Sequence, residues 1–462
     1  MLRILLLLLS LLALGSIGAG PGQPPTYYGE VAEILQANCV DCHTEGGIAP
    51  FPLDDARWAR NMAAAIADSV RQGRMPPWPP GEGTPPLKDE RKLSASAKAA
   101  LIAWAETGAP LGNPRPIAAR ATPPAPQPDL VATLNPPYTP NDALLDDYRC
   151  FLMPATFDRD TYLTGYKVIP GDKRSVHHVI LFLIGPDLVE AAQAKDRAEP
   201  GPGWQCFGGP GLSGDPRNIG GILGFWVPGG GVTMLPEGTG RLVRAGSRVV
   251  MQVHYNTASG ANPDATQMAL YLAPRGVQLK RLVGMTLAAP VEIRCPPGMT
   301  GEQCTRAYAR ARTELGFIAD WIHLLCNTSI EGYLNRDIGD GSRQATSCDW
   351  TVQNALKVYG VTAHMHLRGV EFKVEVNPGT PGARTLFYIP QWNFQWQGEY
   401  WYQTPIRLQR GDRVRVTCVY DNKSAIPGPN GEPLLPRYMT WGEGTTDEMC
   451  LGSLFRGAGV GE

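Results

Sequence analysis

Ala355-Leu-Lys-Val-Tyr-Gly-Val-Thr-Ala-His-Met-His-Leu-Arg-Gly369 is an apolar run that ends in two histidines. Its apolar residues predict a strand, and alternate side chains of a strand project from the same face. His364 and His366 are therefore expected side by side on one face. Two neighbouring imidazoles can form half of a site for copper, zinc or iron, and two ordinary surface histidines are the alternative.

Similar runs occur on both sides of this stretch, for example at 178–184, 247–254 and 413–420. Glycine and proline, at 53 and 43 of the 462 residues, divide these runs by frequent turns. Short strands joined by turns indicate antiparallel β-sandwiches, and the chain from Asp129 onward is long enough for two. The sequence predicts a mainly β protein with two jelly-roll-like sandwich domains, at 129–284 and 285–462.

Met1-Leu-Arg3 precedes an apolar run from Ile4 to Leu14 and small residues through Gly20, which predicts a secretory signal peptide over 1–20. No other stretch is long and apolar enough to predict a membrane span. Ten cysteines suit an oxidising compartment, so the expected location is the periplasm or the extracellular space. The 42 basic and 43 acidic side chains nearly balance and give no electrostatic case for nucleic acid.

Cys39-Val-Asp-Cys-His43 has the C-x-x-C-H spacing that attaches a c-type haem. The two thiols would form thioethers to the porphyrin, and His43 would bind the iron. A redox dithiol or a chance occurrence is the alternative. Met75 is the predicted distal ligand because cytochrome c families commonly present a methionine sulfur on a proline-stiffened loop, and such a thioether raises the haem potential. Met62 is the second candidate, and plain core packing of Met75 is the alternative.

A last helix is expected from Ser94 to Thr107, so the α-helical cytochrome c-like haem domain is predicted over 25–112. The proline- and alanine-rich stretch at 113–128 predicts a semi-rigid linker. Such a linker would keep the haem domain at high local concentration beside the next domain.

Four further histidines remain, and three of them lie at the ends of predicted strands. His177 and His178 open one apolar strand, and His254 closes another. Neighbours on a strand face opposite sides, so His177 and His178 can meet one metal only at a strand end or a distortion. Three imidazoles suit copper, or zinc with an open position. His323 has apolar neighbours and is predicted to be structural.

Four short motifs then occur in a fixed order: Ser175-Val-His-His-Val-Ile180, Gln252-Val-His-Tyr255, Ala363-His-Met-His-Leu367 and Asp447-Glu-Met-Cys450. Over about 130–455 the chain therefore resembles the copper type II, ascorbate-dependent monooxygenases, which include peptidylglycine α-hydroxylating and dopamine β-monooxygenases. The resemblance implies two β-sandwich domains, each with one copper ion, which face one another across a solvent-filled cleft.

The resemblance also implies a role for each ligand. His177, His178 and His254 would hold an electron-transfer copper, whereas His364, His366 and Met449 would hold the copper at which oxygen binds and the substrate C–H bond is attacked. A thioether beside two imidazoles favours Cu(I).

Eight cysteines lie outside the haem motif, so four disulfides are the expected number. The resemblance implies the pairs Cys150–Cys206 and Cys418–Cys450. It offers no counterpart for the other four, which are Cys295, Cys304, Cys326 and Cys348.

The peptide-amidating members of this family carry an arginine two residues before the first histidine of H-x-H, and a tyrosine four residues after the methionine ligand. Thr362 and Ser453 occupy those positions here. The resemblance therefore supports copper and oxygen chemistry but argues against a substrate that ends in glycine.

The sequence thus predicts an exported monooxygenase with two copper ions and one covalent haem c. It would hydroxylate a small organic substrate with O2, and an external donor, ascorbate or a redox protein, would supply electrons through the haem. A non-catalytic electron-transfer or copper-handling protein is the alternative. Zinc-dependent hydrolysis is a weaker one, because methionine is a poor zinc ligand and no general-base carboxylate is expected beside the histidines.

Overall fold

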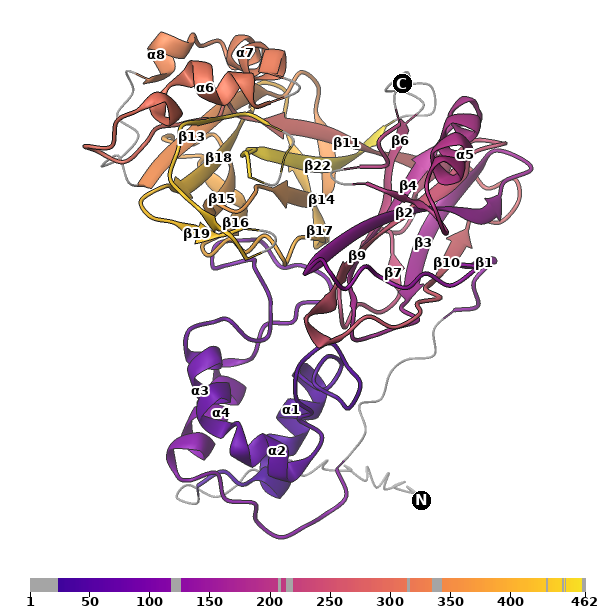
Figure 1. Ribbon diagram of the computed structural model, residues 1–462, viewed down its shortest axis with the longest axis vertical. Helices are drawn as coiled ribbons and strands as arrows, with labels where there is room; N and C mark the ends of the chain where they lie inside the picture. Colours follow the sequence, from indigo (N-terminus) through magenta and orange to yellow (C-terminus); the bar gives the residue numbers. More distant parts are fainter. Residues whose placement is uncertain are drawn as a thin grey trace, which may run out of the picture.

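The computed structural model describes residues 24–117, 126–206, 209–212, 219–313, 316–334, 343–428, 431–442, 444 and 446–458. The predicted signal peptide lies outside these residues, as does half of the predicted linker. Over the described residues the chain is mainly β, with a small helical region at its N-terminal end (Figure 1).

The N-terminal region holds one π-helical turn and four α-helices: η1 (Tyr27–Val31), α1 (Ala32–Asn38), α2 (Ala56–Asn61), α3 (Ala63–Arg71) and α4 (Ala95–Glu106). Helix α4 agrees with the predicted helix, and Ser94 caps it by accepting the backbone N–H of Ala97. These elements bury a small core around Leu35 and Trp104, neither of which is exposed.

The first β unit, residues 129–279, has two layers. One is the five-stranded sheet β5-β2-β9-β4-β6, and the other consists of β1, β10, β3 and β8, with β7 beside β3. Phe151 and Met251 of the five-stranded sheet pack with Leu163 and Met268 of the other layer. The elements of this unit are β1 (Leu130–Thr133), β2 (Asp146–Thr156), β3 (Thr161–Ile169), β4 (Val176–Ile184), η2 (Pro186–Leu188), α5 (Val189–Ala198), β5 (Trp204–Gln205), β6 (Ile219–Trp226), β7 (Thr233–Met234), β8 (Thr239–Val243), β9 (Arg248–Asn256), η3 (Thr257–Ser259) and β10 (Gln267–Leu272).

The second β unit, residues 280–458, repeats this arrangement. The strands β11-β22-β14-β17 face the four-stranded sheet β13-β18-β15-β16 across a core that includes Val361, Leu454, Phe372 and Val416. The elements of this unit are β11 (Lys280–Ala288), β12 (Glu292–Ile293), η4 (Glu302–Cys304), α6 (Arg306–Ala311), α7 (Gly316–Leu325), α8 (Ile330–Leu334), β13 (Arg343–Thr351), β14 (Leu356–His364), β15 (Gly369–Val376), β16 (Arg384–Ile389), β17 (Glu399–Leu408), β18 (Arg413–Asp421), β19 (Ile426–Pro427), β20 (Pro433–Leu434), β21 (Met439–Thr440) and β22 (Leu451–Ala458).

The two β units share one continuous sheet, because the start of β11 pairs in parallel with β8. A buried ion pair adds to this junction, with Nη2 of Arg241 in β8 lying 2.7 Å from Oε1 of Glu399 in β17. The predicted boundary between residues 284 and 285 falls inside β11, which pairs with β22 from Arg281 to Ala288.

Four disulfides are present: Cys150–Cys206, Cys295–Cys304, Cys326–Cys348 and Cys418–Cys450. The expected number and both implied pairs are confirmed. Four disulfides indicate maturation in an oxidising, extracytoplasmic compartment. Within the described part of the chain, every helix is too short or too polar to cross a membrane.

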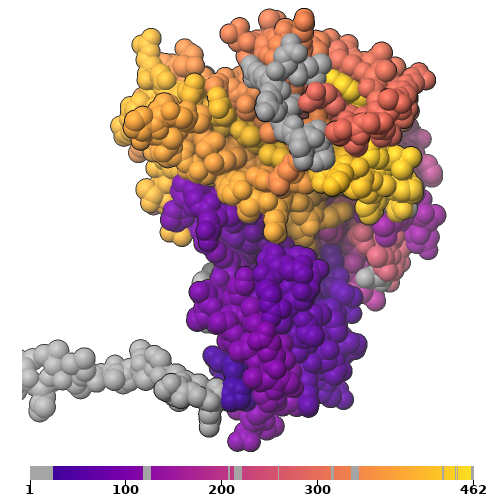
Figure 2. Space-filling model, turned by 90° about the vertical axis from the view of Figure 1, so that its left-hand side faces the viewer, coloured from indigo at the N-terminus to yellow at the C-terminus, as the bar shows by residue number. Residues whose placement is uncertain are grey.

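The helical region contacts the second β unit directly, although its linker leads into the first. Its 78–90 segment runs along β17, where Leu87 forms a bridge with Tyr402 and the N–H of Gln403 donates to the carbonyl of Pro86 (3.0 Å). Leu87 is 1% exposed and belongs to the core of the second β unit. Figure 2 shows the indigo and purple N-terminal region against the orange and yellow second unit. The helical region is therefore docked and not merely tethered.

We expect Leu87→Ala to destabilise the second β unit by about 2–5 kcal/mol, because it leaves a cavity in that core. Leu435→Ala is a matched control, since Leu435 is 66% exposed and such surface changes stay within about 0.5 kcal/mol. Urea unfolding followed by tryptophan fluorescence measures both. Equal stability of the two variants would contradict the packing of the 78–90 segment.

Candidate functional site

The haem motif directly follows α1. The N–H of Cys39 donates to the carbonyl of Leu35, and the N–H of His43 donates to that of Cys39 (2.9 Å), so the motif forms a tight turn. Neither Cys39 nor Cys42 is in a disulfide. The Nδ1–H of His43 donates to the carbonyl of Phe51 (3.2 Å), which leaves Nε2 of the imidazole available. Two unpaired thiols beside an imidazole with a fixed tautomer fit a covalent haem whose iron is bound by His43.

The same turn disfavours a redox dithiol. Burial, and secondarily the neighbouring Cys42, raises the pKa of Cys39 to about 12. Redox-active C-x-x-C motifs instead depend on a thiol whose pKa is lowered, so that a thiolate is present at neutral pH.

The two methionine candidates have different surroundings. Met75 lies after α3 on a loop whose backbone returns to Ser69, and its side chain is 38% exposed. Met62 lies at the junction of α2 and α3 and packs against the helical core. Met75 stays the predicted distal ligand, because its side chain is partly exposed and is not part of the helical core.

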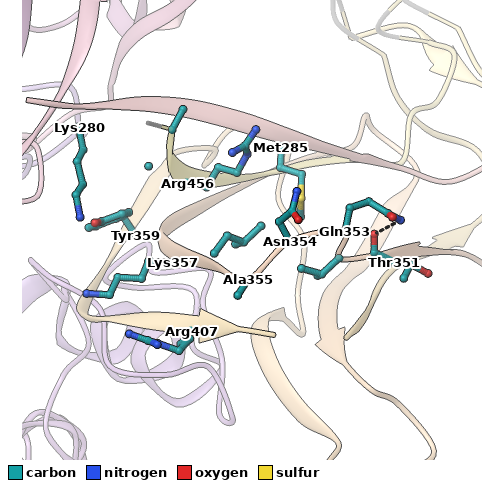
Figure 3. Close-up of a pocket in the computed structure, with 14 residues that line it drawn as sticks. Lys280, Met285, Thr351, Gln353, Asn354, Ala355, Lys357, Tyr359, Arg407 and Arg456 are labelled. Atoms are coloured by element: carbon teal, nitrogen blue, oxygen red, sulfur yellow. Dashed lines mark hydrogen bonds between the residues drawn. The ribbon is translucent and has the colours of Figure 1, made fainter. Parts of the chain in front are cut away.

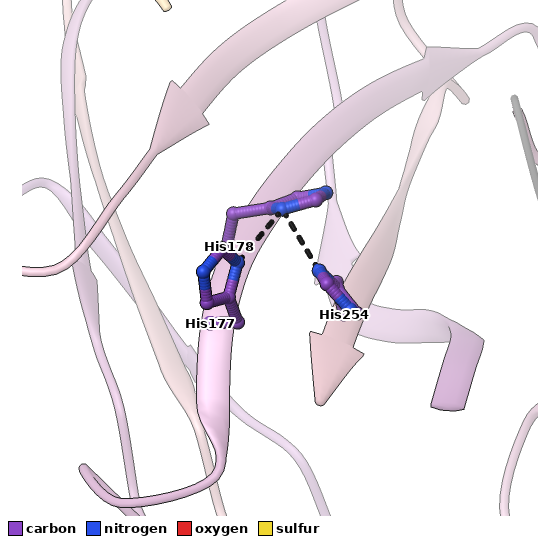
Figure 4. A group of neighbouring side chains, drawn as sticks. All are labelled: His177, His178 and His254. Carbon is purple, nitrogen blue, oxygen red and sulfur yellow. Dashed lines mark hydrogen bonds between the residues drawn. The ribbon is translucent and has the colours of Figure 1, made fainter. Parts of the chain in front are cut away.

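Three histidines converge in the first β unit. His177 and His178 lie on β4 and His254 on β9, and one ring nitrogen from each lies within 4.8 Å of the other two (Figure 4). The pairing of β4 with β9 shifts between Val176 and His178, so His177 occupies a distortion of the strand. This distortion turns two sequence neighbours toward one point, which a shared metal requires.

The first cluster, which we define as His177, His178 and His254, has nitrogens that face inward. Nδ1 of His178 is 3.1 Å from Nδ1 of His254 and 3.5 Å from Nδ1 of His177. Burial lowers the pKa of His177 to about 4 and the pKa values of the other two well below their usual range. Neutral imidazoles with converging nitrogens fit a cation such as copper.

The surroundings of the first cluster hold its rings in place. Nε2–H of His254 donates to Oδ1 of Asp146 (2.7 Å), which leaves the lone pair of Nδ1 facing the other histidines. Tyr148 stacks on His254, and Phe225 stacks on His178. Asp146 is a carboxylate beside the histidines, and the absence of a general-base carboxylate there stays a prediction. This carboxylate also accepts a hydrogen bond from Asn256 and therefore orients a ligand.

The second cluster, which we define as His364, His366 and Met449, lies at the end of β14. Nε2 of His364 is 3.1 Å from Nε2 of His366. Nδ1–H of His364 donates to Oε1 of Gln397 (2.6 Å), and Nδ1–H of His366 donates to the carbonyl of Asp447 (3.1 Å). The Nδ1 atoms of both rings are thus hydrogen-bonded, and the lone pairs of the two Nε2 atoms face each other.

Burial dominates the electrostatics of the second cluster. It lowers the pKa of His364, and with the adjacent His364 it lowers the pKa of His366 to about 3. Both rings are therefore neutral near pH 7. Two facing lone pairs in a buried site repel one another unless a cation lies between them, so the pair fits a metal ion.

Met449 directly follows two residues that contact His366, namely Asp447 and Glu448. His364 pairs with Leu451 across β14 and β22, and Glu448 accepts the backbone N–H of His366 (2.9 Å). The hydroxyl of Tyr420 donates to the carbonyl of Met449 (3.0 Å), and Met449 is 6% exposed. No feature of the sequence identified Gln397 or Asp146 as a partner of the histidines. Glu448 belongs to the motif at 447–450, but it was assigned no role.

His323 lies at neither cluster. Its Nε2 is 3.1 Å from Oε1 of the buried Glu292, which also accepts hydrogen bonds from Arg306 and Tyr438. This buried polar network agrees with the structural role predicted for His323.

A cavity of about 750 Å³ lies at the opposite end of β14 from His364 (Figure 3). Its lining includes four cationic side chains, Lys280, Lys357, Arg407 and Arg456. None of the five clustered histidines lines it, so it is distinct from both clusters.

Comparisons with known proteins support one part of this assignment. Residues 28–104 match the family model described as cytochrome c oxidase, cbb3-type, subunit III. This region is therefore a cytochrome c domain, which indicates electron transfer and a covalent haem c. A comparison with curated proteins found no match.

Similar solved structures include a two-domain protein of unknown function from Bacteroides fragilis, with 7% identity, 70% of this chain and 94% of that chain covered, and a TM-score of 0.15. Oxalate decarboxylase from Bacillus subtilis has 8% identity, 72% and 77% coverage, and a TM-score of 0.13. Likenesses this weak carry no argument about the chain.

We expect Met75→Ala to lower the haem reduction potential, because the thioether is the ligand that raises it. Met62→Ala should leave the potential near that of the wild type and affect only the stability of the domain. Spectroscopic redox titration measures both variants. The assignment is wrong if Met62→Ala lowers the potential and Met75→Ala does not.

Proposed function

We propose that the protein is an exported copper-dependent monooxygenase that hydroxylates a C–H bond of a small organic substrate with O2. In this proposal the two β units are jelly-roll-like sandwiches that each hold one copper ion. The cytochrome c domain relays electrons from an external donor, either ascorbate or a redox protein. The proposal rests on the resemblance over about 130–455 together with the geometry of the two clusters.

The observation that carries the proposal is the inward-facing nitrogens of both clusters. His254, His364 and His366 each have their outer nitrogen hydrogen-bonded, so the opposite nitrogen of each ring is free to bind a metal. Such outer partners are typical of histidines that bind metals, because they fix the tautomer and the ring orientation.

The two clusters differ in the ligands they offer, which supports two roles. Three imidazoles at the first cluster suit a copper that passes electrons, whereas the thioether of Met449 at the second favours Cu(I). Bound copper would supply one-electron redox chemistry and, at the second cluster, the binding of O2. His364, His366 and Met449 would position that chemistry toward a substrate.

The position of the haem motif supports the electron relay. Nη1 of Arg91 donates to the carbonyl of Pro228 (3.0 Å), in the loop that follows β6. A methyl group built on Gly229 of this loop would lie 3.4 Å from Sγ of Cys42. Strand β6 carries Phe225, which stacks on His178. The haem attachment site therefore adjoins the strand that packs on the first cluster.

The departures from the peptide-amidating enzymes also fit the local structure. The hydroxyl of Thr362 donates to the carbonyl of Gly398 (3.1 Å), and Thr362 pairs with Ser453 across the sheet. Neither side chain offers the positive charge that would hold a C-terminal carboxylate. The proposed substrate is therefore a small organic molecule other than a peptide that ends in glycine.

We expect the copper-loaded, reduced protein to consume O2 with a suitable substrate and to place one atom of ¹⁸O2 in the product. His366→Ala should abolish this activity, because only His364 and Met449 would remain as ligands. Oxygen electrode traces and mass spectrometry of the product measure it. If the wild type consumed no O2 with any substrate of a wide panel, a non-catalytic electron-transfer or copper-handling protein would be supported instead.

The haem spectrum in the same reaction tests the relay. One haem stores one electron, so it should be oxidised and reduced again within each turnover. A haem that stayed reduced while O2 was consumed would contradict the relay but leave the monooxygenase proposal intact.

A further inference from the structure

The loop at 390–398 joins β16 to β17 and carries a concentration of aromatic side chains. Nε1–H of Trp392 donates to the carbonyl of His366 (3.1 Å), and the ring of Phe394 lies 6.0 Å from that of His366. The loop therefore packs against the second cluster along most of its length.

Gln397 makes the most direct of these contacts. Its Nε2–H donates to the carbonyl of Phe394 (2.9 Å), which orients the amide so that Oε1 faces His364. Nδ1–H of His364 donates to that oxygen (2.6 Å). The side chain of Gln397 is thus fixed by its own loop and in contact with a candidate metal ligand.

The preceding residue reaches the other β unit. The ring of Trp396 lies 6.0 Å from the ring of His177, at an angle of 47°. Trp396 and Gln397 are consecutive, so one short piece of chain contacts a histidine of each cluster. Protein atoms therefore link the two clusters at this point, beside any solvent-filled cleft of the kind that the resemblance implies.

The end of this loop is fixed to the first β unit. Glu399 starts β17 and forms the ion pair with Arg241, and their side chains are 5% and 8% exposed. The guanidinium of Arg241 also lies over the rings of Trp401 and Phe455. Breaking such a buried pair is costly, so the loop keeps its position relative to the first cluster.

We propose that Trp396 and Gln397 form the route by which an electron passes from the first cluster to the second. This inference rests on the proposed function, since both clusters must hold copper. With copper bound, the first cluster would give up one electron and be oxidised by one unit, and the second would accept it and be reduced by one unit. No proton moves and no bond breaks at Trp396 or Gln397.

This route is favoured because its through-space gaps are short. Electron tunnelling weakens steeply with each gap through space or solvent. From His177 to His364 this route crosses one ring-to-ring contact and one hydrogen bond, and the remainder follows covalent bonds. An electron that bypassed Trp396 would have to cross the interface between the β units elsewhere.

The test uses full-length protein with haem and copper. The first cluster is reduced through the haem by a light-activated ruthenium complex, and freeze-quench electron paramagnetic resonance follows the signal of each copper. We expect Trp396→Leu to lose the fast phase of reduction at the second cluster and Trp396→Phe to keep much of it. Gln395→Ala, in the same loop, is the control and should match the wild type.

Copper content of each variant separates the outcomes. Two bound coppers in Trp396→Leu with an unchanged fast phase would overturn the route while leaving the proposed function intact. A wild type that bound no copper would overturn both.

Gln397 gives an independent readout. Gln397→Ala removes the acceptor for His364, so copper affinity at the second cluster should fall about 10- to 100-fold. Gln397→Glu keeps an acceptor oxygen and should restore the affinity, and the first cluster should be unaffected in both variants. An equal loss at both clusters would mean that the loop acts only through stability and would contradict its role as a link.

Discussion

The two clusters depend on five neutral imidazoles, three of them buried and two half-buried, whose nitrogens face one another within each cluster. Burial lowers the pKa values of all five, so none carries a charge near pH 7. At His254, His364 and His366 the outer nitrogen is already hydrogen-bonded, which directs the other lone pair inward. Facing lone pairs repel unless a cation lies between them, and this constraint makes both clusters metal sites in our account.

The fold supplies this arrangement with few special features. A distortion of β4 at His177 turns two neighbouring residues toward His254, and β14 ends where His364 and His366 can meet. The shared sheet and the Arg241–Glu399 pair then set the two clusters relative to one another. The 78–90 segment docks the cytochrome c domain, so that the haem motif lies beside the loop after β6. The β units therefore contribute chiefly the positions of the two histidine clusters and of the haem motif.

The fold class and the haem domain could be predicted from sequence, because the patterns that indicate them lie within short stretches of the chain. Short apolar runs divided by turns predicted the mainly β fold, and C-x-x-C-H spacing predicted the haem domain that the family comparison supports. The outer partners could not be predicted, since Asp146 and Gln397 meet their histidines through strand register and loop shape. The docked position of Leu87 was equally invisible, because its contacts lie more than 300 residues away along the chain. Contacts between residues so far apart in the sequence produce no periodic pattern from which they could be predicted.

Metal and haem analysis of protein matured in an oxidising compartment tests the central claim most directly. We predict two coppers and one covalent haem per chain. His178→Ala and His366→Ala should each lose one copper and keep the other, because each removes a ligand from a different cluster. One zinc ion and no copper, or loss of both metals in either variant, would contradict the account.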